Sequence, residues 1–142
     1  IINLSSELYK KGKIDINSLK GSDKFNGNQV YSDSKLLVAF FTKELSEKLK
    51  DKNITVNCVH PGVIGSDVLR EYPNIVNKVL NLFTSSVEEG AKPSIYLATS
   101  QEVEDVTGKY YYKTKIKPYI KQLDDDSLSK KIWEESLNIT NL

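Results

Sequence analysis

The chain has 142 residues, of which 39% are apolar, which is enough for one domain with a single buried core. Twenty Lys and Arg side chains against nineteen Asp and Glu leave a net charge of +1, which excludes the strongly basic character of nucleic-acid and anionic-membrane binders. No apolar run approaches the roughly 18–20 residues of a membrane-spanning helix, so no membrane segment is predicted in this chain.

The first predicted element is a short apolar strand over residues 1–5. Residues 7–29 are polar and contain three glycines, which predicts a long loop. From about 29 to 50, apolar residues recur every three or four positions, which predicts a helix with Asn28 as its N-cap. Residues 54–59 are mostly β-branched and apolar, which predicts a buried strand. A strand, a long helix and a second strand form a βαβ unit, so we expect a parallel sheet with a right-handed crossover.

Two helices, a strand and a last helix are predicted in the second half of the chain. The helices cover residues 72–83 and 86–98, and a capping box at Ser86 opens the second one. The tyrosine-rich residues 109–113 predict a strand, and the apolar stripe within residues 125–137 predicts the C-terminal helix.

Other polar and sulfur-containing residues carry weaker predictions. Cys58 lies among apolar residues and is expected to be buried, in a reducing, cytoplasmic compartment. One histidine and one cysteine do not supply the usual ligands of a zinc site, so no metal site is predicted. His60 could relay a proton, but a strand-end role is favoured. The acidic residues 124–126 suit a helix N-terminus, and the tyrosines 110–112 either line a substrate pocket or pack as a strand.

The residues most informative about chemistry are Tyr31 and Lys35. They are four positions apart on the predicted helix, which brings an ammonium group near a phenol. A free phenol ionises at a pKa of about 10 and is a poor base at neutral pH. A neighbouring cation favours the phenolate, as acid/base catalysis on an alcohol requires. Taken alone, the pair also fits an incidental contact on a solvated helix face.

Two strand ends strengthen the catalytic interpretation. The first predicted strand runs into Ser5 and Ser6, and the second runs into His60-Pro61-Gly62. Ligands of open parallel sheets bind beyond the C-terminal ends of the strands. Both strand ends and the start of the Tyr31 helix are therefore expected at one rim.

This ordered set of a serine pair, Tyr-x-x-x-Lys and Pro-Gly-x-x-x-Ser resembles the short-chain dehydrogenase/reductase family. The 25 positions from Ser6 to Tyr31, the His-Pro-Gly sequence and the Gly-Lys-Tyr-Tyr sequence at 108–111 are similar to its retinol-dehydrogenase-like branch. The resemblance implies an α/β fold with a doubly wound, Rossmann-like parallel sheet, of which residues 1–142 are the C-terminal part. We expect the cofactor-binding N-terminal half, with its glycine-rich loop and the catalytic Asn, to lie upstream, and the chain has no methionine.

Carried over residue by residue, the resemblance implies that Tyr31 is the acid/base group. Lys35 would favour its phenolate form and hydrogen-bond the nicotinamide ribose, so that both residues also belong to the cofactor site. Ser6 would hold the substrate oxygen, with Ser5 as the second choice. The cofactor is NAD or NADP, and the residues expected to line its nicotinamide are Pro61, Gly62, Val63, Ile64 and Ser66.

The resemblance therefore implies an NAD(P)-dependent oxidoreductase that interconverts a carbonyl and an alcohol by tyrosine acid/base catalysis and hydride transfer. The substrate is a small molecule, lipophilic if the branch assignment holds. We expect the 142 residues to be inactive alone and the complete protein to be a homo-oligomer. The alternative is a non-catalytic binding or regulatory module that retains part of the dehydrogenase fold.

Overall fold

The computed structural model contains both helices and strands and describes residues 1–19, 25–63 and 86–141. The strands are β1 (Ile2–Leu4), β2 (Asn57–His60), β3 (Tyr110–Tyr112) and β4 (Lys115–Lys117). The helices are α1 (Gly27–Lys48), α3 (Val87–Thr99) and α4 (Asp126–Thr140). The helix predicted over 72–83 lies outside the described residues. Within the described ranges, no helix combines the length and the apolar character needed to cross a membrane.

The four strands form one sheet in the order β1-β2-β3-β4. β1 pairs in parallel with β2, with Asn3 opposite Cys58, and β2 pairs in parallel with β3, with Cys58 opposite Tyr110. β4 runs antiparallel beside β3. The predicted βαβ unit and parallel sheet are confirmed, whereas β4 was not predicted.

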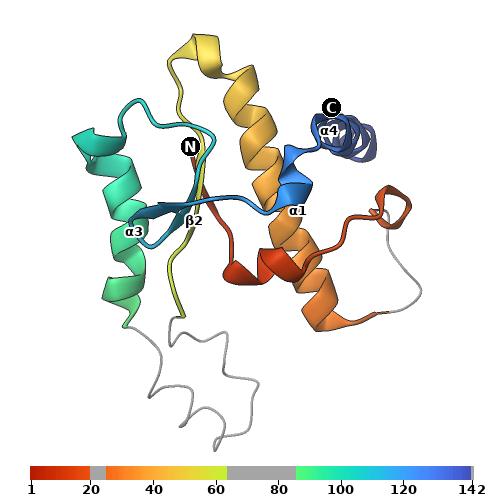
Figure 1. The fold of residues 1–142 in the computed structure, drawn as a ribbon, viewed down its shortest axis with the longest axis horizontal. Coiled ribbons are helices and arrows are strands. Elements are labelled where there is room, and N and C mark those ends of the chain that lie inside the picture. Colours follow the sequence, from red (N-terminus) through yellow and green to blue (C-terminus); the bar gives the residue numbers. More distant parts are fainter. Residues whose placement is uncertain (20–24, 64–85, 142) are drawn as a thin grey trace, which may run out of the picture.

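The two faces of the sheet carry different helices. Cys58 and Tyr110 pack on the side of α1, whereas the next residues in each strand, Val59 and Tyr111, pack with side chains of α3. Figure 1 shows α1 and α3 on opposite sides of the strands, with α4 beyond α1. A mostly parallel sheet covered by helices on both faces is the doubly wound, Rossmann-like α/β fold that the sequence predicts.

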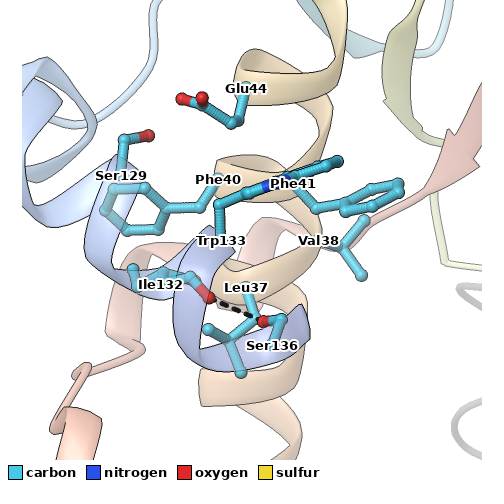
Figure 2. A pocket seen from close by; sticks show the side chains of 9 residues that line it. All are labelled: Leu37, Val38, Phe40, Phe41, Glu44, Ser129, Ile132, Trp133 and Ser136. Atoms are coloured by element: carbon cyan, nitrogen blue, oxygen red, sulfur yellow. Dashed lines mark hydrogen bonds between the residues drawn. The ribbon is translucent and has the colours of Figure 1, made fainter. Parts of the chain in front are cut away.

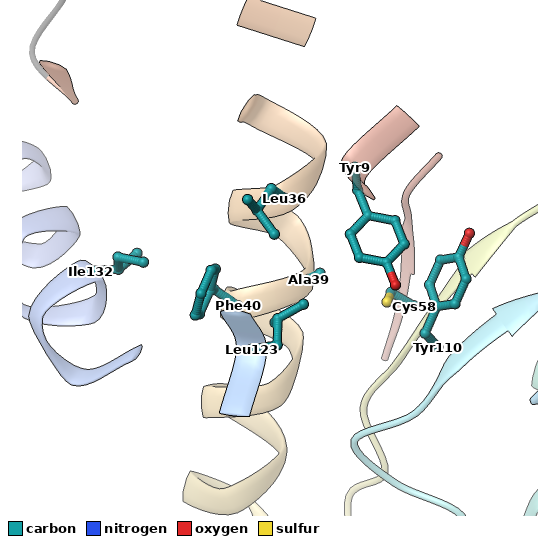
Figure 3. Close-up of a cluster of buried hydrophobic side chains, with 8 residues drawn as sticks. All are labelled: Tyr9, Leu36, Ala39, Phe40, Cys58, Tyr110, Leu123 and Ile132. Carbon is teal, nitrogen blue, oxygen red and sulfur yellow. The ribbon is translucent and has the colours of Figure 1, made fainter. Parts of the chain in front are cut away.

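One core cluster lies between the sheet, α1 and α4. Leu36, Ala39 and Phe40 are spaced three and four positions apart, so they form one apolar stripe along α1. Figure 3 shows this stripe between side chains of the strands and of the C-terminal region. The buried members of the cluster are Tyr9, Leu36, Ala39, Phe40, Cys58, Tyr110, Leu123 and Ile132.

Cys58, the single cysteine of the chain, is fully buried in this cluster, as predicted. Its Sγ lies 3.5 Å from the Tyr119 hydroxyl oxygen. Burial raises the pKa of the Cys58 thiol, because the apolar surroundings disfavour the thiolate.

The N-terminus of α1 differs from the prediction. Asn26, and not Asn28, is the N-cap: its backbone is extended, and its side-chain oxygen accepts a hydrogen bond from the Gln29 amide at 3.2 Å. Asn28 lies in the first turn, where its carbonyl oxygen accepts a hydrogen bond from the Ser32 hydroxyl at 2.8 Å. The helix therefore begins two residues, or about half a turn, earlier than predicted.

The loop predicted over residues 7–29 is wrong in part, because it contains two 3-10 helices, η1 (Glu7–Lys11) and η2 (Ile16–Ser18). Ser6 caps η1 and Asp15 caps η2, each by accepting a hydrogen bond from a backbone amide two residues later. Tyr9 of η1 is fully buried. Its ring anchors this segment in the core. The mostly polar composition of the segment gives no sign of such an anchor.

Gly12 follows η1 and lies directly against α1. An added Cβ would lie 2.7 Å from the Ser32 carbonyl oxygen and 2.8 Å from the Leu36 Cβ. Since both distances are shorter than van der Waals contact, a methyl group would push η1 away from α1. We expect Gly12→Ala to lower the free energy of unfolding by about 1–3 kcal/mol, as measured by urea denaturation.

Gly27 provides the matched control for this substitution. Its added Cβ would meet only the ring of Phe25, at 3.6 Å, and alanine favours the first turn of a helix. Gly27→Ala should therefore leave the unfolding midpoint unchanged or slightly higher. An equal loss of stability in both variants would contradict the close approach at Gly12.

The acidic residues before α4 serve the helix N-terminus, as predicted. The Asp125 carboxylate accepts a hydrogen bond from the Leu128 amide at 2.9 Å and caps the helix. Lys43 of α1 donates a hydrogen bond to the Leu123 carbonyl oxygen, and its Nζ lies 3.5 Å from the Asp126 carboxylate. These contacts hold the start of α4 against α1.

Candidate active site

The segments predicted to carry chemistry meet at the C-terminal ends of the parallel strands. Ser5 and Ser6 follow β1, and Pro61 follows β2, which lies beside β1 in the sheet. The first turns of α1, which contain Tyr31, lie at the same end. The convergence predicted from the chain order is therefore present.

These segments surround a half-open cavity of about 830 Å³. Three elements supply its walls: the start of η1, the start of α1 and the end of β2. Four of the predicted site residues contribute to it, namely Ser6, Tyr31, Gly62 and Val63. The complete lining is Ser6, Glu7, Leu8, Asn26, Gly27, Asn28, Tyr31, His60, Gly62 and Val63.

Tyr31 and Lys35 are neighbours on α1, as their spacing predicts. The Lys35 Nζ lies over the Tyr31 ring, 5.6 Å from its centroid. It also donates a hydrogen bond to the Leu4 carbonyl oxygen, at the end of β1, at 3.2 Å. The Tyr31 side chain is 44% exposed at the cavity wall. The lysine therefore connects the strand end to the phenol, and the phenol stays accessible from the cavity.

The two serines differ in their surroundings. The Ser5 amide donates to the Val59 carbonyl oxygen at 2.8 Å, and the Ser5 hydroxyl donates to the Lys35 carbonyl oxygen at 3.3 Å. Ser6 lines the cavity, and its Oγ accepts a hydrogen bond of 3.3 Å from the Leu8 amide. Since that bond uses the oxygen only as an acceptor, the Ser6 hydroxyl hydrogen can still be donated to a ligand.

The segment after β2 brings backbone to the cavity. Gly62 is buried and has a φ of +106°, in the region that favours glycine. An added Cβ there would lie 3.4 Å from the Cε of Lys113. Val63, the next residue, is 61% exposed. Ile64 and Ser66, also predicted to belong to the site, lie outside the described residues.

Two charged or titratable groups complete the wall. Burial lowers the pKa of His60, an effect that the charge of Glu7 opposes and those of Lys10 and Lys113 reinforce. Burial by itself would raise the pKa of Glu7, but hydrogen bonds from Lys10 and Tyr110 hold it below its usual value. The cavity wall thus carries a neutral imidazole and an ionised carboxylate at neutral pH.

Glu7 was missed in the sequence analysis. Its place directly after Ser6 was the available signal, since consecutive residues at a strand end reach the same rim. Its partner could not be read from the sequence, because the Tyr110 hydroxyl that donates to its Oε1 is 103 positions away.

The tyrosines 110–112 pack as part of the strand and do not line this cavity. Tyr110 and Tyr111 are 0% and 1% exposed. The Tyr112 ring lies with its centroid 5.4 Å from that of His60, and Tyr112 is not part of the cavity lining. Of the two roles considered for these tyrosines, the structure favours strand packing.

A second, smaller cavity of about 200 Å³ lies between α1 and α4 and was not predicted. Figure 2 shows its aromatic side chains, and the rings of Phe41 and Trp133 stack with centroids 5.5 Å apart. None of the predicted site residues lines it. The lining residues are Leu37, Val38, Phe40, Phe41, Glu44, Ser129, Ile132, Trp133 and Ser136.

Metal chemistry gains no support from the described part of the chain. There, His, Cys, Asp and Glu side chains form no group of three or more that could hold a metal ion. Besides backbone groups, the larger cavity is lined by the phenol of Tyr31, the hydroxyl of Ser6, the carboxylate of Glu7 and the imidazole of His60, and Lys35 lies beside the phenol.

Comparisons with known proteins identify relatives of the chain. The family model described as short chain dehydrogenase matches residues 5–75, which is half of the chain. The chain is 38% identical to retinol dehydrogenase 14 of Homo sapiens, over 96% of this chain and 42% of that protein. It is 35% identical to retinol dehydrogenase 13 of Homo sapiens, over 100% of this chain and 46% of that protein.

A solved structure of a protein from Mycobacterium Paratuberculosis shares the fold, with a TM-score of 0.68 and 19% sequence identity. The similarity covers 99% of this chain and 49% of that one. The chain thus spans less than half the length of the curated relatives it matches.

Proposed function

Because the chain belongs to the short-chain dehydrogenase family, we propose that the protein is an NAD(P)-dependent oxidoreductase that interconverts a carbonyl and an alcohol. The observation that carries the proposal is the meeting of Ser6, Tyr31 and Gly62 in the wall of one cavity. Open α/β sheets bind ligands at this edge. A hydride-transfer reaction needs a proton donor, a group that holds the carbonyl oxygen and a surface for the nicotinamide, and these residues can supply them.

Tyr31 is the general acid and base in this proposal. Its hydroxyl donates a proton to the carbonyl oxygen during reduction and accepts one from the alcohol during oxidation. The Lys35 ammonium group lies over the Tyr31 ring, 5.6 Å from its centroid, and places a positive charge beside the phenol. The same ammonium group has further hydrogens to donate to the ribose of a bound nucleotide. The Ser6 hydroxyl holds the substrate oxygen.

The residues after β2 fit a nicotinamide nucleotide. Because Gly62 has no side chain and a positive φ, a flat ring can approach its backbone closely. Pro61 and Val63 flank this position, and Ile64 and Ser66 belong to the same proposed site although they lie outside the described residues. When it is bound, the nucleotide supplies or accepts the hydride.

A lipophilic substrate is proposed on two grounds. Leu8 and Val63 present apolar side chains at the cavity and are 42% and 61% exposed. Burying such side chains against an apolar substrate is favourable by about 25 cal/mol per Å². The relatives are named retinol dehydrogenases, after an apolar alcohol.

We further propose that residues 1–142 act as the C-terminal half of a single Rossmann-like domain. The family relatives are more than twice as long as the matched region. A pyrophosphate group binds best at a helix N-terminus that follows a glycine-rich turn. The proposal places that turn upstream of residue 1. The 142 residues alone should therefore bind the nucleotide only weakly and should not catalyse the reaction.

The test is an oxidoreductase assay on the complete protein. NADPH and NADH are supplied separately, with a long-chain apolar aldehyde as substrate and a short polar aldehyde as comparison, and oxidation of the nucleotide is followed by its fluorescence. We expect turnover with one or both nucleotides and a higher kcat/KM for the apolar aldehyde. A well-folded protein that binds neither nucleotide would favour the non-catalytic alternative.

Replacing each serine separately tests which of them contacts the substrate. Ser6→Ala removes a hydroxyl from the cavity wall, so it should lower kcat on the order of a hundredfold, with the nucleotide Kd nearly unchanged. Ser5→Ala removes only a hydrogen bond to the Lys35 carbonyl oxygen and should change kcat much less. Steady-state kinetics and a nucleotide titration provide both quantities. A larger effect of Ser5→Ala would reverse the assignment.

A further inference from the structure

η1 connects the proposed substrate serine to β3 through one side chain. Glu7 is the first residue of η1 and directly follows Ser6. Its Oε1 accepts a hydrogen bond of 2.7 Å from the Tyr110 hydroxyl, and its Oε2 accepts one of 2.8 Å from the Lys10 Nζ. Both carboxylate oxygens are therefore engaged, and one of the partners belongs to the sheet.

On the basis of the function proposed above, we propose that Tyr110 is a positioning residue that fixes Ser6 through Glu7. The hydrogen bond that the Ser6 Oγ accepts from the Leu8 amide is long, 3.3 Å, so it restrains the side chain weakly. Ser6 therefore needs a further restraint. Its carbonyl oxygen accepts from the Tyr9 amide at 3.0 Å, which ties Ser6 to η1. The orientation of Ser6 toward the cavity therefore depends on how η1 is held.

Tyr110 is a rigid support for this contact. It is fully buried in β3, and its ring centroid lies 4.8 Å from that of Tyr9 and 6.1 Å from that of Tyr119. At the other end of η1, Gly12 lies directly against α1. η1 is thus held between β3 and the helix that carries Tyr31, and a change at the Tyr110 contact would move Ser6 relative to Tyr31.

The charge states of the two groups preserve this contact. Burial, together with the hydrogen bond to Glu7, raises the pKa of Tyr110, so its hydroxyl remains a donor. Although burial opposes it, the pKa of Glu7 stays below its usual value because of its bonds to Lys10 and Tyr110. A hydrogen bond between a neutral donor and an ionised acceptor is stronger than one between neutral groups.

A double-mutant cycle in the complete protein tests the proposal. Tyr110→Phe removes only the hydroxyl and keeps the buried ring, and we expect it to lower kcat about tenfold, which corresponds to about 1.4 kcal/mol. The nucleotide Kd should stay within about twofold, because the change acts on the substrate side. In the Ser6→Ala background, Tyr110→Phe should lower kcat less than about twofold, since no serine hydroxyl remains to be positioned.

Tyr111→Phe is the matched control. Tyr111 is the next residue of the same strand, is equally buried and packs on the α3 side, and its hydroxyl has no hydrogen-bond partner among the described residues. It should leave kcat unchanged. A second pair of variants tests the same contact from the side of Glu7. Glu7→Gln keeps an oxygen that can accept the Tyr110 hydrogen bond, so it should retain more turnover than Glu7→Ala.

Three outcomes would overturn the positioning role. Equal effects of Tyr110→Phe in both backgrounds would show that Tyr110 acts independently of Ser6, with the serine assignment intact. An equal loss in Tyr111→Phe would point to general destabilisation of β3. If Ser6→Ala itself leaves kcat unchanged, the proposed role of Ser6 fails, and the positioning role fails with it.

Discussion

Replacing Tyr31 with phenylalanine is expected to lower the kcat of the complete protein by about a hundred- to ten-thousand-fold, the usual contribution of a positioned acid/base group. The substitution keeps the ring beneath the Lys35 ammonium group and removes only the hydroxyl at the cavity wall. Nucleotide affinity should therefore change little. Steady-state kinetics and a fluorescence titration of NADPH or NADH measure the two effects separately.

Tyr96→Phe is the control for this experiment. Tyr96 lies on α3, where its hydroxyl donates a hydrogen bond of 2.9 Å to Glu102, on the opposite side of the sheet from α1. Removing that hydroxyl should leave kcat unchanged. Wild-type turnover in Tyr31→Phe would rule out Tyr31 as the proton donor, and a matching loss in Tyr96→Phe would show that the assay reports folding.

The largest loss of stability is expected for Phe40→Ala. Phe40 is 1% exposed and belongs to the core cluster that joins α1 to the sheet and to α4. Removing the ring leaves a cavity that the surrounding side chains cannot fill, which costs about 3–5 kcal/mol of unfolding free energy. Urea denaturation, monitored by circular dichroism, measures this change in unfolding free energy.

Phe41→Ala, at the next position of α1, is the matched control. Phe41 is 44% exposed and stacks on Trp133 at the smaller cavity. Loss of the ring contact should lower the unfolding free energy of Phe41→Ala by about 0.5–1.5 kcal/mol. Loss of the burial of a half-exposed ring lowers it further. If Phe41→Ala were as destabilising as Phe40→Ala, the α1 to α4 contact would rival the central cluster in importance.

The sequence predicts how the candidate site residues are placed relative to one another, because that placement depends on short-range regularities. Tyr31 and Lys35 are neighbours because four positions make about one helical turn. Ser6 and Gly62 meet because parallel strands have their C-terminal ends at one edge. Periodicity and strand order are enough for both inferences, and they require no knowledge of side-chain contacts.

What the sequence does not predict depends on long-range contacts or on a choice between similar residues. The hydrogen bond between Glu7 and Tyr110 joins residues 103 positions apart, and no local pattern marks it. Asn26 and Asn28 are equally good N-cap residues, and the structure selects the first. The polar stretch after Ser6 hides a buried Tyr9, because one aromatic ring hardly changes the composition of a segment.

β4 was missed for a related reason. Lys115–Lys117 has only three residues, all of them exposed, so its alternation of lysine and isoleucine is too short to mark a half-buried strand. Lysines are nevertheless common on edge strands, where their charge discourages pairing with other chains. Composition alone therefore reads this segment as a loop.

The buried position of Cys58 has a consequence for chemical labelling. Alkylating reagents attack the thiolate, and this thiol lies in the core, where that form is disfavoured. A reagent reaches it only when the layer between α1 and the sheet opens. Because Cys58 is the one cysteine of residues 1–142, the rate of its alkylation would report that opening without a probe introduced into this region.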